Sequence, residues 1–302
     1  MTSKPWSTRE SLIDRTGRLK KVSINGKSLS ATLTESCISA SVSSSMSSIS
    51  EMKFTFLDTP DAQLFRSGVF QDGMVVSFEH WRGRIKGGGR LKPGPGGPQV
   101  EVTAPSLFVH RLQNQTGARN WGHQSVNRWM KAQCDAVGLA SQIETYVGYQ
   151  TIVREAPDKN SDGDPQSTWD VMVELAEKYD CWLFEHSARL IFAKPQTMTH
   201  SMYIRREVPL RWSGWDDMSE ALMGMPDFTP GEQAEQKLRV QIVGNDADRV
   251  CPGDTVILSG RLNGGTRAMN ANGRWLVSDI TIPLTRREAV TLDCIRPVRG
   301  AL

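Results

Sequence analysis

An alternation of oxygen-bearing side chains in the segment DKNSDGD, which begins at residue 158, is the pattern that most resembles a metal site. Asp158, Asn160 and Asp162 stand at alternate positions and a glycine follows them, as in the first half of a calcium-binding loop. The twelfth position of such a loop holds a bidentate Glu, but here it is Trp169, so two of roughly seven oxygen ligands are missing. We interpret the segment as a polar turn before a helix and keep the three residues as a weak calcium candidate.

Side chains suited to catalysis are present, but their spacing does not bring them together. Glu185 and His186 are neighbours on a predicted strand, so they point to opposite faces and cannot serve one reacting atom. The sequence has no G-x-S-x-G and no H-E-x-x-H, and its five cysteines are scattered, which indicates neither a zinc site nor a disulfide framework. We therefore predict that the protein is not an enzyme and holds no cofactor.

The glycine- and proline-rich stretch KGGGRLKPGPGGP, which ends at residue 98, lacks the G-x-x-x-x-G-K-[ST] spacing of a phosphate-binding loop. It also joins a strand to a strand, so no helix N-terminus follows to receive a phosphate. We predict an irregular loop over residues 87–98 that is ordered on assembly. Its candidate contact residues are Gly87, Gly88, Gly89, Pro93 and Gly94.

The composition is that of an ordinary globular protein with room for two or three domains. The chain has 302 residues, of which 38% are hydrophobic and 23% are charged. No apolar run approaches the roughly 20 residues of a membrane span, and no apolar stretch follows the N-terminal cations. We therefore expect the chain to be made and folded in a cytoplasm, with no membrane anchoring.

The net charge of +3 is concentrated near the N-terminus. Seven Lys or Arg residues lie within residues 1–27, against Glu10 and Asp14. Such a basic arm can bind nucleic acid, but more often it is a mobile tail or an assembly arm. We favour the second interpretation for residues 1–19.

The hydrophobic periodicity changes twice along the chain. Residues 20–110 alternate in the way of antiparallel strands, residues 111–200 show two helices and a hairpin, and residues 201–302 alternate again. The predicted fold class is α+β and mostly β, with two small antiparallel β-barrel-like domains on either side of a two-helix α+β domain. Residues 201–235 could instead complete the first barrel or form the seam between domains.

Two further features support that division. Asp72-Gly73 followed by Gly83-Arg84 is echoed by Gly253-Asp254 followed by Gly273-Arg274, each with a strand after the acidic-glycine turn. If the echo is real, the two outer domains are versions of one barrel. Trp212 and Trp215 near a predicted helix start indicate either an inter-domain seam, which we favour, or an aromatic platform for a carbohydrate.

The segment from Trp169 to Phe184 reads W-D-x-M-x-E-L-A-E-K-Y-x-x-W-L-F, and Leu190-Ile191-Phe192 follows it as a second strand. This motif, set between two β regions, resembles the phage tail hub family. That family includes late-control-D-like baseplate hubs and the first domains of type VI secretion spike proteins. The resemblance covers nearly the whole chain in the order of its parts.

The resemblance implies a structural virion protein that is assembled in the host cytoplasm. Such a hub is a homotrimer at the distal end of the tail; it joins the sixfold tail tube to the threefold tip or spike and leaves a channel for DNA. The implied partners are other copies of the chain, the tail tube or distal tail protein ring, the tape-measure protein and a separate spike or tip protein, with DNA only in transit. The alternatives are the hub of a phage-derived contractile injection system and, in another class, a cell-wall-degrading enzyme or carbohydrate-binding tail module.

Overall fold

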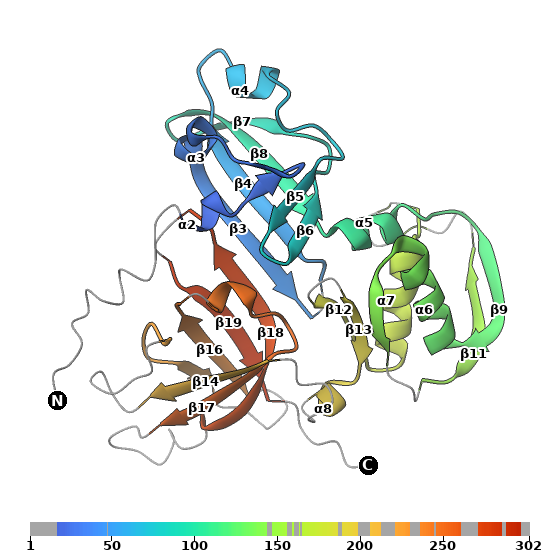
Figure 1. Cartoon of the computed structure of the whole chain (residues 1–302). Coiled ribbons are helices and arrows are strands. Elements are labelled where there is room, and N and C mark those ends of the chain that lie inside the picture. The colour runs from blue at the N-terminus through green and yellow to red at the C-terminus, as the bar shows by residue number, and fades with distance from the viewer. Residues whose placement is uncertain are drawn as a thin grey trace.

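The computed structural model describes most of the chain, namely residues 17–46, 48–143, 147–155, 159, 163, 165–186, 189–198, 206–212, 221–229, 236–244, 246–260, 271–285 and 288–296, with the main chain alone at 186, 196 and 197. We call residues 17–106 the first β region, residues 107–198 the α+β unit and residues 206–296 the second β region. Figure 1 shows the first β region above the second, with the α+β unit beside them.

The elements of the first β region, in chain order, are α2 (Gly17–Lys20), β1 (Ser23–Ile24), β2 (Lys27–Ser28), α3 (Ala31–Ser36), β3 (Cys37–Ser45), β4 (Glu51–Leu57), α4 (Gln63–Arg66), β5 (Val75–Phe78), β6 (Trp81–Arg84), β7 (Arg90–Gly94) and β8 (Gly97–Pro105). Those of the α+β unit are α5 (Leu107–Gln113), β9 (Arg119–Ser125), α6 (Val126–Val137), β10 (Ala140–Ile143), β11 (Tyr149–Arg154), α7 (Thr168–Lys178), β12 (Trp182–His186), β13 (Arg189–Ala193) and α8 (Pro195–Met198). The second β region holds β14 (Glu207–Trp212), β15 (Asp227–Thr229), β16 (Lys237–Ile242), the 3-10 helix η2 (Ala247–Arg249), β17 (Thr255–Gly260), β18 (Gly273–Pro283) and β19 (Val290–Ile295).

One ten-stranded sheet runs through both β regions. Its main path is β15-β16-β19-β18-β3-β4-β8-β7, and β14 and β17 join it through β18. The connection is possible because β18 is eleven residues long and pairs with β19, β17 and β3. The α+β class with a mostly β content is confirmed, whereas the described residues show no closed barrel and instead place the two β regions in one sheet.

The serine-dense segment that begins at Cys37 forms β3, as its alternation predicts. Ala40, Val42 and Ser44 are buried, and the residues between them are at least partly exposed. The pairing with β4 shifts register between Cys37 and Ser39, so Ile38 falls at the irregularity and is 38% exposed. One inserted residue thus moves an apolar side chain to the surface while the rest of the strand keeps its buried face.

The prediction of irregular structure over residues 87–98 is wrong in its middle part. β7 (Arg90–Gly94) is a regular strand that pairs with β8, and Pro93 lies opposite Pro98. Prolines fit here because β7 is the last strand on the path, where one edge of the strand needs no ladder hydrogen bonds. Gly96 and Gly97 have φ values of 86° and 132°, so the glycines make a tight hairpin turn rather than a long loop.

The α+β unit confirms the two predicted helices and the hairpin. Ser125 caps α6 by accepting the amide of Arg128, so this helix begins later than its apolar pattern suggests, after β9. At α7, Ser167 and Asp170 form the capping box that their spacing predicts. The hairpin β12–β13 lies in a three-stranded sheet with β10, and it follows α7 directly.

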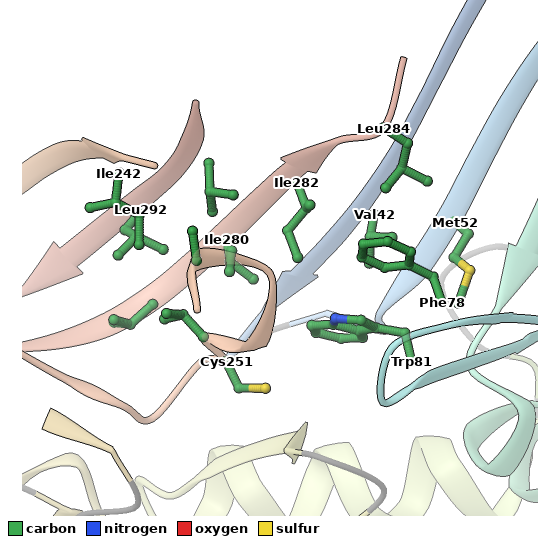
Figure 2. Packing of buried hydrophobic residues seen from close by; sticks show 14 of the residues in the cluster. Val42, Met52, Phe78, Trp81, Ile242, Cys251, Ile280, Ile282, Leu284 and Leu292 are labelled. Atoms are coloured by element: carbon green, nitrogen blue, oxygen red, sulfur yellow. The ribbon is translucent and has the colours of Figure 1, made fainter. Parts of the chain in front are cut away.

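Two main hydrophobic clusters match these divisions. The larger one takes side chains from both β regions, and Figure 2 shows it as a row from Ile242 and Leu292 through Ile280 and Ile282 to Val42. The other fills the α+β unit around its helices. Burying these side chains supplies the main favourable term for each part. Of the helices in the described part of the chain, none combines the length and apolar character that crossing a bilayer requires.

The echo between the β regions corresponds to a shared turn. Gly73 and Gly253 have φ values of 84° and 90°, and each donates its N–H to the carbonyl of Ile85 or Val277, at 2.9 Å in both hairpins. In each case the residue after the glycine accepts a hydrogen bond in return. The sequence echo set Gly73 beside Asp254 and Arg84 beside Arg274, so the matched residues differ from it by one at the turn and by two in the following strand. That the two regions are whole copies of one domain stays a prediction.

Candidate assembly surface

Large apolar side chains are exposed at one end of the first β region. Leu57 ends β4 and is 39% exposed, Phe65 on α4 is 44% exposed, and Leu91 on β7 is 45% exposed. With Ile38 they form what we call the apolar end, and Figure 1 places α4, α3 and β7 together there. Leu57 and Leu91 lie on opposite faces of the sheet, because their β8 partners Gln99 and Val100 are consecutive residues. The apolar end is a candidate protein–protein contact in which the partner reaches both faces.

A buried carboxylate fixes Phe65 in its exposed position. Asp58 follows β4 and accepts hydrogen bonds from the backbone amides of Thr59, Leu64 and Phe65 at 2.7–2.9 Å. Burial alone would raise the pKa of Asp58, but these hydrogen bonds outweigh burial and the pKa lies below its ordinary value. The short helix α4 is therefore pinned to the end of β4.

The hairpin β7–β8 makes a hollow beside these side chains. A cavity of about 470 Å³ is lined by Leu91, Lys92, Pro93, Gly94, Gly97 and Pro98. Leu57 lies over the turn, since its Cδ1 atom is 3.8 Å from the point where a Cβ at Gly96 would stand. Strand, turn and Leu57 together give the apolar end a shape that another protein surface can fill.

The structure places the five candidate contact residues, four glycines and one proline, in two groups. Gly87, Gly88 and Gly89 form the turn before β7, where Asp72 Oδ1 accepts the amide of Gly87 at 2.7 Å and Phe70 accepts that of Gly89 at 2.9 Å. Pro93 and Gly94 end β7 and line the hollow. Both groups are held by the fold, and their role in assembly stays a prediction.

A second surface lies over the second β region and combines charged with apolar side chains. A groove of about 530 Å³ is bounded by Trp182 of β12 and by the strands β15, β16, β19 and β18. Across these strands Asp227, Arg239, Asp293 and Asp279 are successive cross-strand partners. Arg239 forms hydrogen bonds with Asp293 at 2.6 and 3.2 Å, and chiefly for that reason its pKa is raised. Asp279 and Asp293 place like charges directly opposite each other.

The two β regions also meet through an ionic junction, which we define as Arg18, Lys21, Glu79 and Asp248. Arg18 Nε lies 2.6 Å from Asp248 Oδ1, and the two side chains are only 11% and 6% exposed. Lys21 lies 2.7 Å from Glu79 and 3.4 Å from Asp248. The hydrogen bond between Lys21 and Glu79 raises the pKa of the lysine and lowers that of the glutamate.

Beside this junction, Cys251 Sγ lies 2.9 Å from His80 Nε2. A thiol and an imidazole at this distance are the elements of a nucleophilic pair. Cys251 is fully buried, however, so a substrate has no access to its sulfur atom. The pair therefore links the regions rather than serving catalysis. All five cysteines are thiols, not disulfides, and four of them are buried.

The α+β unit meets the first β region through buried hydroxyl groups. Ser106, just after β8, donates its hydroxyl hydrogen to Glu185 Oε2 on β12, and both residues are buried. The amide of Ser106 donates to Ser50 O at 2.8 Å, and Ser50 Oγ lies 2.6 Å from Ser44 Oγ. We call Ser44, Ser50, Ser106 and Glu185 the hydroxyl junction. Burial raises the pKa of Glu185 to about 7, although the Ser106 hydrogen bond opposes the rise.

Other sequence candidates fall outside the described residues or lose their proposed role. Asp158, Asn160 and Asp162 lie outside the described residues, as do Trp215 and most of the basic arm. Trp212 is 4% exposed and belongs to the large core, so its ring is not a platform for a carbohydrate. The described residues contain no group of three or more His, Cys, Asp or Glu side chains placed to hold a metal ion.

Comparison with known proteins was made by sequence and by structure. No protein-family model matches the chain, and no curated protein sequence matches it. Among solved structures, the 43 kDa tail protein of prophage MuSo2 from Shewanella oneidensis is 10% identical, with a TM-score of 0.60 over 91% of this chain and 97% of that one. The tail protein from Neisseria meningitidis MC58 is 11% identical, with a TM-score of 0.59 over 91% and 95%.

A third solved structure comes from a secretion apparatus. The E. coli c3393 protein is described as a component of the type VI secretion system with structural similarity to the T4 bacteriophage tail proteins gp27 and gp5. It is 10% identical, with a TM-score of 0.60 over 92% of this chain and 77% of that one. The chain thus has a fold shared by phage tail proteins and by a type VI secretion component, as its resemblance to tail hubs predicts.

Proposed function

We propose that this chain is a structural protein of a phage tail, acting as a homotrimeric hub between the sixfold tail tube and the threefold tip. The observation that carries the proposal is the similarity in fold to two tail proteins over nine tenths of the chain. The shared turn at Gly73 and Gly253 supports a relation between the two β regions, on which the match to a sixfold tail tube depends. Three copies of a chain with two related β regions present six such regions, which suits a sixfold neighbour.

In this proposal the hub has no catalytic role. It seats the tape-measure protein, leaves a channel for DNA and receives a separate spike or tip protein. Such a trimer must persist for the life of a virion, so its interfaces belong to the obligate class above roughly 2,000 Å². The similarity to the type VI component favours a second candidate of the same mechanical kind, the hub of a contractile injection system.

We assign the apolar end to the contact with the tail tube or distal tail protein ring. Deleting residues 87–98 would remove β7 and the turn into β8 from the sheet, so a single substitution is the better test. Leu91→Glu places a charge in the contact but leaves the β7–β8 pairing intact. The matched control is Val153→Glu, because Val153 on β11 is also an exposed β-strand residue, 40% exposed, in the α+β unit.

The experiment supplies each variant in trans to a phage that lacks the gene and counts completed tails by electron microscopy. We expect Leu91→Glu to fold and to reach the same oligomeric state as the wild type, yet to yield few completed tails, whereas Val153→Glu completes them. Normal tails with Leu91→Glu would remove the apolar end from the contact. A wild-type protein that does not restore tails would reject the structural role itself.

A further inference from the structure

The contact between Glu185 and Ser106 joins two parts of the molecule whose main cores are separate and which share one smaller apolar cluster around Met46, Leu276 and Phe184. Ser106 follows the last residue of β8 in the large sheet, and Glu185 lies on β12 in the three-stranded sheet of the α+β unit. The Ser106 hydroxyl donates to the Glu185 carboxyl, and the Ser106 amide is held by Ser50 O at 2.8 Å. The carboxyl therefore connects β12 to a fixed point on the large sheet.

Charged groups on the neighbouring elements do not offset a negative charge at Glu185. Burial and the Ser106 hydrogen bond are the two causes that act on its pKa. The titratable side chains of the elements around it are Glu51 and Lys53 on β4, Arg82 and Arg84 on β6, Glu101 on β8, His110 and Arg111 on α5, Asp170, Glu174, Glu177 and Lys178 on α7, and Arg189 on β13. The groups on the sheet strands and on α5 have other described partners: Glu51 pairs with Lys53, Arg82 donates to Glu79 O, Arg84 donates to Gly73 O, Glu101 pairs with Lys92, Arg111 donates to Val137 O, and His110 lies 3.1 Å from the Asn114 amide. Asp170 belongs to the capping box of α7. Glu174, Glu177, Lys178 and Arg189 are exposed.

We propose that Glu185 and Ser106 form a proton-dependent latch that holds the α+β unit against the large sheet. With a neutral carboxyl, the hydrogen bond closes the contact and no charge is buried. With an ionised carboxyl, one hydroxyl donor has to stabilise a charge that water would stabilise better, so opening of the contact becomes more favourable.

The pH range of the latch follows from the two states of the carboxyl. In the open state its pKa is near the ordinary 4.5, and burial in the closed state raises the pKa to about 7. The closed state therefore binds more protons between these values. Its stability is greatest at acid pH and falls as the pH rises towards the closed-state pKa, above which the loss is complete.

The test compares hydrogen–deuterium exchange at about pH 5.5 and about pH 8.5 in the wild type and in Glu185→Gln, with amide rates corrected for their intrinsic pH dependence. Gln keeps the shape and the acceptor of the side chain but does not ionise. In the wild type we expect protection of β12 and of the amides around Ser106 to fall by roughly thirtyfold at the higher pH, because part of the total effect is already present at pH 5.5. In Glu185→Gln we expect protection to change little.

The matched control is Glu174→Gln, the same substitution at an exposed position of α7, which should retain the wild-type response. Should Glu185→Gln fail to fold, carbon-13 NMR of the glutamate carboxyls in the wild type decides the question. A Glu185 carboxyl signal that titrates near pH 7 while the contact is closed, and titrates with the other glutamates once the contact is open, supports the latch. A Glu185 carboxyl that titrates near 4.5, or equal pH responses in Glu185→Gln and the wild type, would overturn it.

Discussion

The ionic junction and the hydroxyl junction hold neighbouring parts of the same molecule by opposite means. The ionic junction joins the two β regions through four charged side chains, of which Asp248 is buried and accepts from both Arg18 and Lys21. The hydroxyl junction joins the α+β unit to the sheet through serines and one carboxyl with no cation at hydrogen-bond distance among the described residues. The two junctions differ in how a negative charge is accommodated. In the ionic junction, Arg18 and Lys21 neutralise the carboxylates, whereas in the hydroxyl junction burial favours the neutral form of Glu185.

This difference predicts distinct responses to pH. At the ionic junction the pKa of Glu79 is lowered, so its contribution is present above the ordinary value and is lost as the pH falls. The pKa of Lys21 is raised, so its contribution is present below the ordinary value of 10.5 and is lost only as the pH rises beyond it. The contribution of the ionic junction to stability is thus constant above the ordinary pKa of a glutamate, in the range from about 4.5 to about 7 where the contribution of the hydroxyl junction falls.

Among the variants that test this comparison, Asp248→Ala should lower the free energy of unfolding most, because it leaves the mostly buried Arg18 without its anion. Breaking one partner of a buried pair costs about 4 kcal/mol of the free energy of unfolding. Urea denaturation at neutral pH would measure the loss. Asp246→Ala removes an exposed carboxylate, 84% exposed and 4.0 Å from Arg249, and should change stability by less than about 0.5 kcal/mol. Equal effects of the two variants would show that Asp248 is not the centre of the junction.

Ser106→Ala should have a smaller and pH-dependent effect. At acid pH it removes one hydrogen bond of a neutral carboxyl, which costs about 1 kcal/mol. The Ser106 hydrogen bond opposes the raised pKa of Glu185, so its loss should raise that pKa further and extend the fall in stability to higher pH. Chemical denaturation across a pH series gives both quantities. A parallel shift at every pH would mean that Ser106 contributes packing alone.

Asp279→Asn should have the smallest effect, and in the stabilising direction. Asp279 and Asp293 are direct cross-strand partners, and Arg239 pairs with Asp293. Removing one of two opposed like charges should raise the free energy of unfolding by roughly 0.5 kcal/mol, and the gain should shrink at high salt. Asp293→Asn is the informative counterpart, since it gives up the Arg239 pair and should not stabilise the protein. A lower free energy of unfolding in Asp279→Asn would contradict the interpretation that Asp279 and Asp293 repel each other.

The local elements could be predicted from the sequence because their signals are local. Alternation predicts β8 and β16, and the spacing of Ser167 and Asp170 predicts the start of α7. The strand β7 could not be predicted, since its proline and its glycine are unfavourable in strands and fit only at a sheet edge. The pairing of the long β18 with β3, which joins the two expected barrels into one sheet, could not be predicted either. Periodicity indicates a strand but not its pairing partner.

The two junctions could not be predicted because their partners are far apart in the chain. Ser106 and Glu185 are 79 residues apart, and Arg18 and Asp248 are 230 apart. No pattern of residue types carries that pairing. For Glu185 the adjacency to His186 argued against a shared catalytic role but did not indicate a partner, and the structure sets its carboxyl against a serine in a closed interface. The available signal of burial was that Glu185 follows the apolar residues Leu183 and Phe184 on the same strand.

The most direct test of the account is electron cryomicroscopy of the purified oligomer. The account predicts a threefold ring with a mass near three times 33.6 kDa, in which first and second β regions alternate around the axis so that six similar β units surround a channel. A particle that stays monomeric at every concentration, or a ring in which the two β regions lie at different radii, would contradict the central claim.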